Sequence, residues 1–167
     1  MEKDIRVLLV DDHFLVREGV KSMLDQEEDI HVVGQAANAE EALSQLEKLS
    51  PDIVLMDIKM SGVDGIELTR MLKTKKPFVK FIMLTLYDQY VAEALRAGAS
   101  GYLLKDVGSE ELRRTIRQVN DCKQVVSGSI RPTVLINYED KQEPKAASHL
   151  GRISRDAVDS SASRGGQ

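Results

Sequence analysis

Four short apolar runs punctuate the first 105 residues, and each of them stops at a polar residue. The runs cover residues 5–10, 53–56, 81–84 and 102–104, and a similar segment covers residues 30–36. Apolar runs of this length are typical of strands that are buried on both faces of a sheet. The chain therefore predicts five short buried strands, which constrains the fold more than any other feature of the sequence.

Segments with helical spacing separate these runs. Apolar side chains recur at intervals of three and four residues within residues 16–24, 39–46, 68–72, 91–95 and 112–119. Asn38, Asp88 and Ser109 stand where helix N-caps are expected. Five strands that alternate with five helices predict an α/β protein with a parallel sheet covered on both faces. Right-handed crossovers favour the flavodoxin-like, doubly wound strand order 2-1-3-4-5.

The alternating pattern ends near Cys122. We therefore predict one domain over residues 4–122. Residues 123–138 contain Gly128 and Pro132 and are predicted to be a linker. Residues 139–167 are rich in small and charged side chains and are predicted to be a disordered tail.

Composition narrows the classes of protein to which the chain can belong. A hydrophobic content of 42% and a charged content of 30% are ordinary for a globular protein. The formal net charge of −4 gives no overall attraction to nucleic acid or to an anionic membrane. No apolar run approaches the roughly 20 residues of a membrane-spanning helix. The single Cys122 and the charged start of the chain, which does not resemble a secretory signal, lead us to expect a cytoplasmic protein.

The polar residues that end the strands predict a functional site. Asp11 and Asp12 follow the first strand, and Asp57 follows the third. In the predicted strand order these two strands are neighbours, so the three carboxylates meet at one edge of the sheet. Carboxylates this close repel one another unless a cation or a proton intervenes. We therefore expect Asp11 and Asp12 to bind Mg²⁺ and Asp57 to attack phosphorus as a nucleophile, forming an acyl phosphate.

Three further residues have the chemistry that such a site needs. The backbone carbonyl of Lys59 is a candidate metal ligand, Lys105 a candidate for neutralising phosphoryl oxygens, and the Thr85 hydroxyl a candidate donor to them. Asp12, Thr85 and Lys105 each have a purely structural alternative. Asp12 can be a helix cap, Thr85 a β-branched strand residue and Lys105 a solvated loop residue. The combination of five suitable polar residues at four strand ends favours the functional interpretation.

These motifs resemble the response-regulator receiver domain of two-component signalling. The similarity rests on residues 8–13, 57–60, 84–85 and 101–106. Residues 10–19 (VDDHFLVREG) and 98–105 (GASGYLLK) resemble the NarL/FixJ, or LuxR-type, subfamily in particular. The resemblance covers about residues 4–122 and implies the CheY-like form of the flavodoxin-like fold.

The resemblance also implies a mechanism. A sensor histidine kinase would donate phosphoryl to Asp57 in a Mg²⁺-dependent reaction, and the chain would catalyse only its own phosphorylation and dephosphorylation. Thr85 and Tyr102 would form the switch, with Tyr102 turning inward behind Thr85. Ser61 replaces a frequent proline and Leu86 a frequent small residue, while Lys59 and Tyr87 are placed to shield the acceptor from water. We interpret His13 as a residue that begins the first helix, with a metal ligand or phosphodonor as the alternative.

The output of the predicted switch is harder to assign. NarL/FixJ regulators usually continue into a helix-turn-helix domain, but residues 139–167 show neither amphipathic helices nor a basic stripe. We expect a receiver that acts on a downstream partner or by self-dimerisation, without DNA binding by this chain alone and without a membrane contact. The first alternative is a shortened or partner-dependent transcription regulator. The second is a Mg²⁺-dependent phosphohydrolase, in which the position of Lys59 would normally hold a second aspartate.

Overall fold

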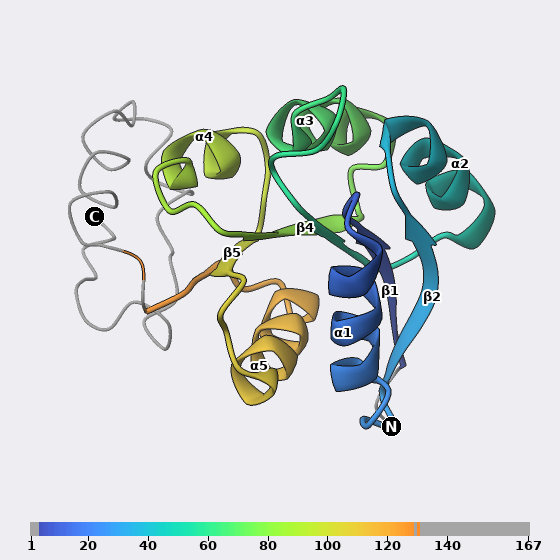
Figure 1. Cartoon of the computed structure of the whole chain (residues 1–167), viewed down its shortest axis with the longest axis vertical. Coiled ribbons are helices and arrows are strands. Elements are labelled where there is room, and N and C mark those ends of the chain that lie inside the picture. The colour runs from blue at the N-terminus through green and yellow to red at the C-terminus, as the bar shows by residue number, and fades with distance from the viewer. Residues whose placement is uncertain (1–3, 129, 131–167) are drawn as a thin grey trace.

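A computed structural model describes residues 4–128 and residue 130, and Figure 1 shows the order and arrangement of its helices and strands. The strands are β1 (Ile5–Val10), β2 (Ile30–Ala36), β3 (Ile53–Met56), β4 (Lys80–Thr85), β5 (Gly101–Leu104) and β6 (Val125–Val126). The helices are α1 (Phe14–Leu24), α2 (Ala39–Leu49), α3 (Gly65–Lys75), α4 (Val91–Arg96) and α5 (Ser109–Asn120). All five predicted strands and all five predicted helices are present.

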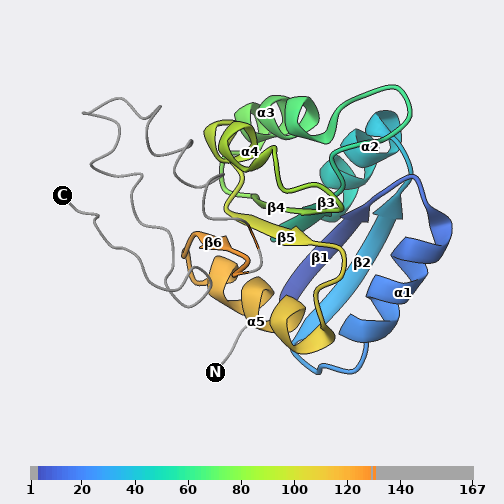
Figure 2. The ribbon, with the colours of Figure 1, turned by 60° about the vertical axis from the view of Figure 1, so that its left-hand side comes forward.

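The strands form one parallel sheet in the order β2-β1-β3-β4-β5-β6. The predicted doubly wound order is therefore confirmed. The strand order reverses between β1 and β3, which lie side by side with Val10 opposite Met56. This reversal creates a crevice at the carboxyl ends of the two strands, where ligands bind in open α/β sheets. Figure 2 shows the strand arrows of this sheet from the side.

The sheet contains one strand more than the sequence predicted. β6 pairs with β5 through Gly101 opposite Val125 and Tyr102 opposite Val126. The backbone N–H of Ser127 extends this ladder by donating to the carbonyl of Tyr102 over 2.9 Å. The start of the predicted linker 123–138 therefore belongs to the sheet. Residue 129, residues 131–138 and the predicted tail 139–167 lie outside the described residues.

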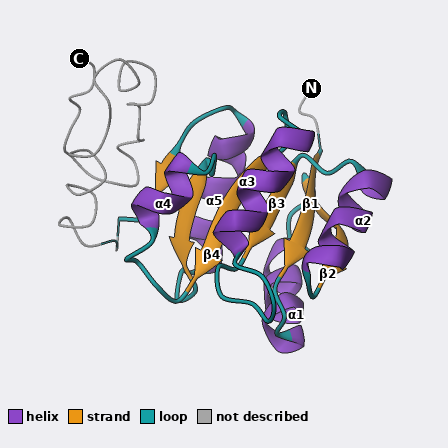
Figure 3. Ribbon diagram, turned by 90° about the horizontal axis from the view of Figure 1, so that it is seen from above, coloured by secondary structure: helices purple, strands orange, loops and turns teal. Residues whose placement is uncertain are grey.

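The two faces of the sheet carry separate apolar cores. Figures 1 and 3 show α2, α3 and α4 on one face, with α1 and α5 on the other. Alternate residues of β1 point to opposite faces, so Leu8 packs in the first core and Leu9 in the second. Leu46 of α2 and Leu112 of α5 represent the helical contributions to these two cores. Burial on both faces explains why the strands are continuous apolar runs.

Of the three N-cap residues predicted from the sequence, one is confirmed and two are wrong. Asn38 caps α2 as predicted, accepting a hydrogen bond of 2.8 Å from the Glu41 backbone N–H. The Glu41 carboxylate in turn accepts the Ala37 N–H over 2.8 Å. Asp88 and Ser109 were expected to cap α4 and α5, but the N-cap positions belong to Tyr90 and Gly108. None of the helices among the described residues is long and apolar enough to span a bilayer.

An ionic cluster fastens α5 to the loop between α1 and β2. The Arg117 guanidinium donates to both carboxylate oxygens of Asp29 over 2.8 and 2.9 Å, and to Glu27 over 2.5 Å. Arg113 lies 3.0 Å from the other Glu27 oxygen. The hydrogen bonds from Arg117 hold the pKa of Asp29 below its ordinary value of 3.8. Because these bonds favour the ionised carboxylate, folding gains stability whenever Asp29 is ionised.

Replacing Asp29 by Asn should reduce the free energy of unfolding by about 1 kcal/mol at pH 7, since the bidentate pair is partly solvent-screened. The folded-state pKa of Asp29 is depressed, so its contribution is fully present above pH 3.8 and is lost as the pH falls through the lower folded value. Urea unfolding at several pH values measures this difference. Asp25→Asn, which removes only the exposed pair with Lys21, is the control. A difference that persists unchanged at the lowest pH would contradict this account.

Candidate functional site

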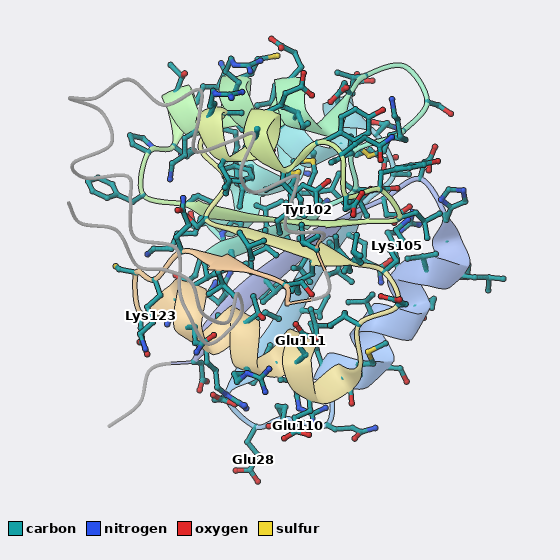
Figure 4. The ribbon with its side chains drawn as sticks, turned by 90° about the vertical axis from the view of Figure 1, so that its left-hand side faces the viewer. Glu28, Tyr102, Lys105, Glu110, Glu111 and Lys123 are labelled. Carbon is teal, nitrogen blue, oxygen red and sulfur yellow. The ribbon has the colours of Figure 1, made fainter. Side chains whose placement is uncertain are left out.

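Three strand ends bring their polar residues together. Asp11 follows β1, Asp57 follows β3 and Lys105 follows β5. The Lys105 ammonium lies 3.0 Å from Oδ2 of Asp11 and 3.0 Å from Oδ2 of Asp57, so it bridges two carboxylates from separate strands. Figure 4 shows Lys105 at the end of the molecule opposite Lys123. The predicted meeting of these side chains at one edge is what the structure shows.

Burial sets the electrostatics of this bridge. Asp11 and Asp57 are only 6% and 4% exposed. Burial raises the pKa of Asp57 because it disfavours the ionised form, and the neighbouring Lys105 only partly offsets this effect. Burial alone would lower the pKa of Lys105, but its hydrogen bonds to the two carboxylates outweigh that effect and raise it. The ammonium therefore stays charged, and it stabilises two buried acids at once.

Asp12 and His13 extend the acidic cluster toward solvent. Asp12 accepts hydrogen bonds from the backbone N–H of Ser61 over 3.0 Å and from its hydroxyl over 3.3 Å. Partial burial raises the pKa of Asp12, but these bonds and the nearby His13 lower it overall. His13 begins α1 at the N-cap position, as interpreted from the sequence. Its Nδ1 also lies 3.1 Å from Oδ1 of both Asp11 and Asp12, a proximity that the sequence alone did not indicate.

The donor set fits a divalent cation. Asp11, Asp12, His13 and Asp57 each offer one ligand atom, and these atoms lie within 4.8 Å of one another. Oδ1 of Asp12 is buried and lacks a hydrogen bond among the described residues, although His13 Nδ1 is close. A buried carboxylate oxygen without a partner is costly, and a hard cation such as Mg²⁺ would satisfy it. The carbonyl of Lys59 stays a predicted ligand.

Thr85 and Tyr102 lie behind the bridge. Thr85 is fully buried at the end of β4, and its hydroxyl has no hydrogen-bond partner among the described residues. Its backbone carbonyl accepts the Lys105 N–H over 2.7 Å, so the two predicted site residues are adjacent. Tyr102 is also fully buried, and its hydroxyl donates to the carbonyl of Tyr87. Figure 4 labels Tyr102 at the layer of the sheet, and its part in a switch stays a prediction.

Comparison with known proteins agrees with this geometry. Residues 7–117 match the family described as the response regulator receiver domain. The chain belongs to this family. A solved receiver domain of the putative response regulator NarL from Mycobacterium tuberculosis is 30% identical, with a TM-score of 0.68, covering 72% of this chain and 98% of that one.

Two curated relatives are longer than the matched region. The response regulator GacA of Pseudomonas aeruginosa is 43% identical over 83% of this chain and 66% of its own length. The transcriptional regulatory protein DegU of Brevibacillus brevis is 37% identical over 85% of this chain and 63% of its own length. The chain thus spans just under two thirds of the length of these relatives. The NarL/FixJ resemblance of residues 10–19 and 98–105 is confirmed at the level of the receiver domain.

One residue that shapes the receiver site was not predicted from the sequence. Gly65 begins α3, and a Cβ atom there would lie 1.9 Å from the backbone carbonyl oxygen of Asp57. The Gly65 N–H also donates to the carbonyl of Ile58 over 2.7 Å. Asp64 caps the same helix by accepting the Ile66 N–H over 2.7 Å. The loop after Asp57 therefore returns so closely onto that residue's backbone that only glycine fits. The turn 61–65 contains two glycines, but nothing in the sequence says which one makes this approach.

Replacing Gly65 by Ala should destabilise the receiver by about 1–3 kcal/mol, because the added methyl group meets backbone rather than a flexible side chain. The loop after Asp57 should shift as well. Thermal or urea unfolding measures the stability change. Gly19→Ala is the matched control, since a Cβ atom there meets nothing within 4 Å and alanine favours the α1 helix by about 1 kcal/mol. Equal stability changes of the same sign for the two variants would refute the close-approach argument.

Proposed function

We propose that this chain is a phosphoacceptor response regulator of a two-component system, in which Asp57 takes phosphoryl from a sensor histidine kinase in a Mg²⁺-dependent reaction. The observation that carries the proposal is the Lys105 ammonium, 3.0 Å from a carboxylate oxygen of Asp57 and 3.0 Å from one of Asp11. A carboxylate nucleophile beside a cation and a second acid is the arrangement that phosphoryl transfer to aspartate requires. Membership of the receiver family supports the same reaction.

The chemistry is an in-line displacement. An oxygen of Asp57 forms a bond to phosphorus as the bond from phosphorus to the donor's imidazole nitrogen breaks, and the electron pair leaves with the imidazole. Asp11, Asp12, Asp57 and the carbonyl of Lys59 would hold Mg²⁺, which neutralises charge on the phosphoryl oxygens. Lys105 moves its hydrogen bond from the carboxylate to a phosphoryl oxygen. Only the ionised carboxylate attacks, and burial raises the pKa of Asp57. The reaction therefore needs Lys105 and Mg²⁺ nearby to favour the ionised form.

The buried hydroxyl of Thr85 supplies the switch. In the structure it has no partner among the described residues, so it gains a hydrogen bond when a phosphoryl group arrives at Asp57. Movement of Thr85 toward the phosphoryl group would displace the end of β4 and the loop after it. In that loop the carbonyl of Tyr87 accepts a hydrogen bond from the Tyr102 hydroxyl. Phosphorylation would thus favour one packing of α4 and β5 over another, which is a shift in population. A downstream partner or a second copy of the chain would read that surface.

Regulation of transcription is the second candidate, and the name of DegU favours it as the output. A gel-shift assay with promoter DNA separates the two functions. The phosphohydrolase alternative lacks support at Lys59, where a second carboxylate would be needed as general acid.

Acetyl phosphate with Mg²⁺ should label the protein once, and Asp57→Asn should abolish the label, because the amide cannot form the acyl phosphate. Chelating the metal should suppress labelling of the unaltered chain. Phosphate-affinity electrophoresis or intact mass spectrometry measures the product. The control, Asp121→Asn, changes an exposed aspartate at the end of α5 and should leave labelling unchanged. Persistent labelling of the Asp57 variant would sink the proposed function.

Thr85→Val should raise the free energy of unfolding by about 1 kcal/mol, since it replaces a buried unpaired hydroxyl with a methyl group of similar size. Labelling at Asp57 should persist, but the change in hydrogen exchange at α4 on labelling should disappear. Thr69→Val removes another buried, unpaired hydroxyl and should stabilise to a similar extent while leaving the α4 response intact. An intact α4 response in the Thr85 variant would count against its role as sensor.

A further inference from the structure

Three of the four tyrosines of this chain lie close together, two of them in the loop between β4 and α4 and the third in β5. The rings of Tyr87 and Tyr90 meet edge to face, with centroids 6.1 Å apart and planes at 80°. Tyr102 joins them through its hydroxyl, which donates to the carbonyl of Tyr87. Aromatic residues make up only 4% of the sequence, so this gathering concentrates much of the aromatic surface at one place. Edge-to-face pairs of this kind stabilise the arrangement beyond the area they bury.

Lys59 attaches the loop after Asp57 to this group. Its ammonium lies 4.8 Å from the centroid of the Tyr90 ring. Interaction with Tyr90 is also the main reason why the pKa of Lys59 is raised. Within the part of the chain that the structure describes, no carboxylate lies within ion-pair distance of this ammonium. The Lys59 side chain is therefore directed to α4 rather than to the acids of the site.

Tyr90 stands at a weak point of the fold. It occupies the N-cap position of α4, but its side chain makes no capping hydrogen bond. The helix has only six residues, and such a short helix depends on tertiary contacts. Val91, the first residue of α4, is fully buried, whereas Tyr90 is partly exposed and contacts Lys59 and Tyr87. These two contacts hold the Tyr90 ring at the start of α4.

The other side of Lys59 is anchored by backbone. Lys59 pairs with Asp64 in an antiparallel bridge, next to the bond from the Gly65 N–H to the carbonyl of Ile58. Lys59 is also close in the chain to Asp57, with only Ile58 between them. The segment after the acceptor is thus fixed on one side by the start of α3 and on the other by the start of α4. A displacement of α4 would therefore move Lys59 directly, through its contact with Tyr90, and would not require Thr85 to move.

We propose that Tyr90 is a positioning residue of the receiver site, which acts through Lys59 to hold the loop after Asp57 against the start of α4. This inference rests on the proposed function and deepens it. The Lys59–Tyr90 contact keeps the Lys59 carbonyl in place for Mg²⁺ and ties the geometry of the metal site to the position of α4. Any partner that moves the start of α4 then changes metal affinity and the lifetime of the phosphoryl group.

The test measures Mg²⁺ dissociation constants by calorimetric titration of the unphosphorylated, full chain. Tyr90→Leu and Lys59→Met should each weaken Mg²⁺ binding about two- to fivefold, the range of an exposed cation–π contact. Tyr90→Phe, which keeps the ring, should stay nearer to the unaltered protein than Tyr90→Leu. The double variant, Lys59→Met with Tyr90→Leu, should be no weaker than either single variant, because both changes remove one contact.

Lys75→Met is the matched control, since this exposed lysine lies in the last turn of α3 and makes no ion pair among the described residues. It should bind Mg²⁺ like the unaltered chain. Phosphoryl lifetimes, measured after labelling and removal of the donor, should change in the same order as the metal affinities. Unchanged Mg²⁺ binding in Tyr90→Leu, or single effects that multiply in the double variant, would overturn the inference. Failure of the unaltered chain to label would instead overturn the proposed function, because metal titration needs no phosphoryl donor.

Discussion

The rest of the site depends on one ammonium group between two buried carboxylates. Lys105 ends β5, while Asp11 and Asp57 end β1 and β3, so a single cation joins three strand ends. Each acid alone would be costly at 6% or 4% exposure, and the shared cation makes their burial tolerable. Because the strands are parallel and their order reverses between β1 and β3, all three groups meet at one edge without any contribution from a long loop.

The fold was readable from the sequence because parallel strands buried on both faces must be apolar runs and their helices must be amphipathic. The residues at strand ends, such as Asp57 and Lys105, could be found for the same reason. The sequence analysis did not predict β6, because a run of two apolar residues, Val125 and Val126, is too short to distinguish a strand from a loop. The importance of Gly65 was missed because it lies in how the loop after Asp57 folds back on that residue's backbone, which local spacing does not encode. His13, by contrast, was placed at the start of the first helix from the sequence, and it lies at the N-cap of α1 beside Asp11 and Asp12.

The same group of acids can serve an enzyme or a signal, and the difference lies in the residue two positions after the nucleophile. A phosphohydrolase needs a second carboxylate to protonate the leaving group and activate water. Here that position holds Lys59, and its ammonium rests on the Tyr90 ring rather than in the site. An acyl phosphate formed at Asp57, as we propose, would therefore meet no general acid or base at that position. This difference at one position favours the proposed signalling role over a phosphohydrolase.

In the switch that we propose, energetics argue that Thr85 does not act alone. Moving a two-state equilibrium from 1:99 to 99:1 takes about 5.5 kcal/mol of differential interaction. One hydrogen bond from the Thr85 hydroxyl to a charged phosphoryl group contributes about 1.5–3 kcal/mol. An exposed cation–π contact such as that between Lys59 and Tyr90 contributes about 0.5–1 kcal/mol. A full change of state must then combine several contacts. Tyr87 is placed to combine them, because its carbonyl holds the Tyr102 hydroxyl and its ring packs on Tyr90, so motion of the loop after β4 alters both at once.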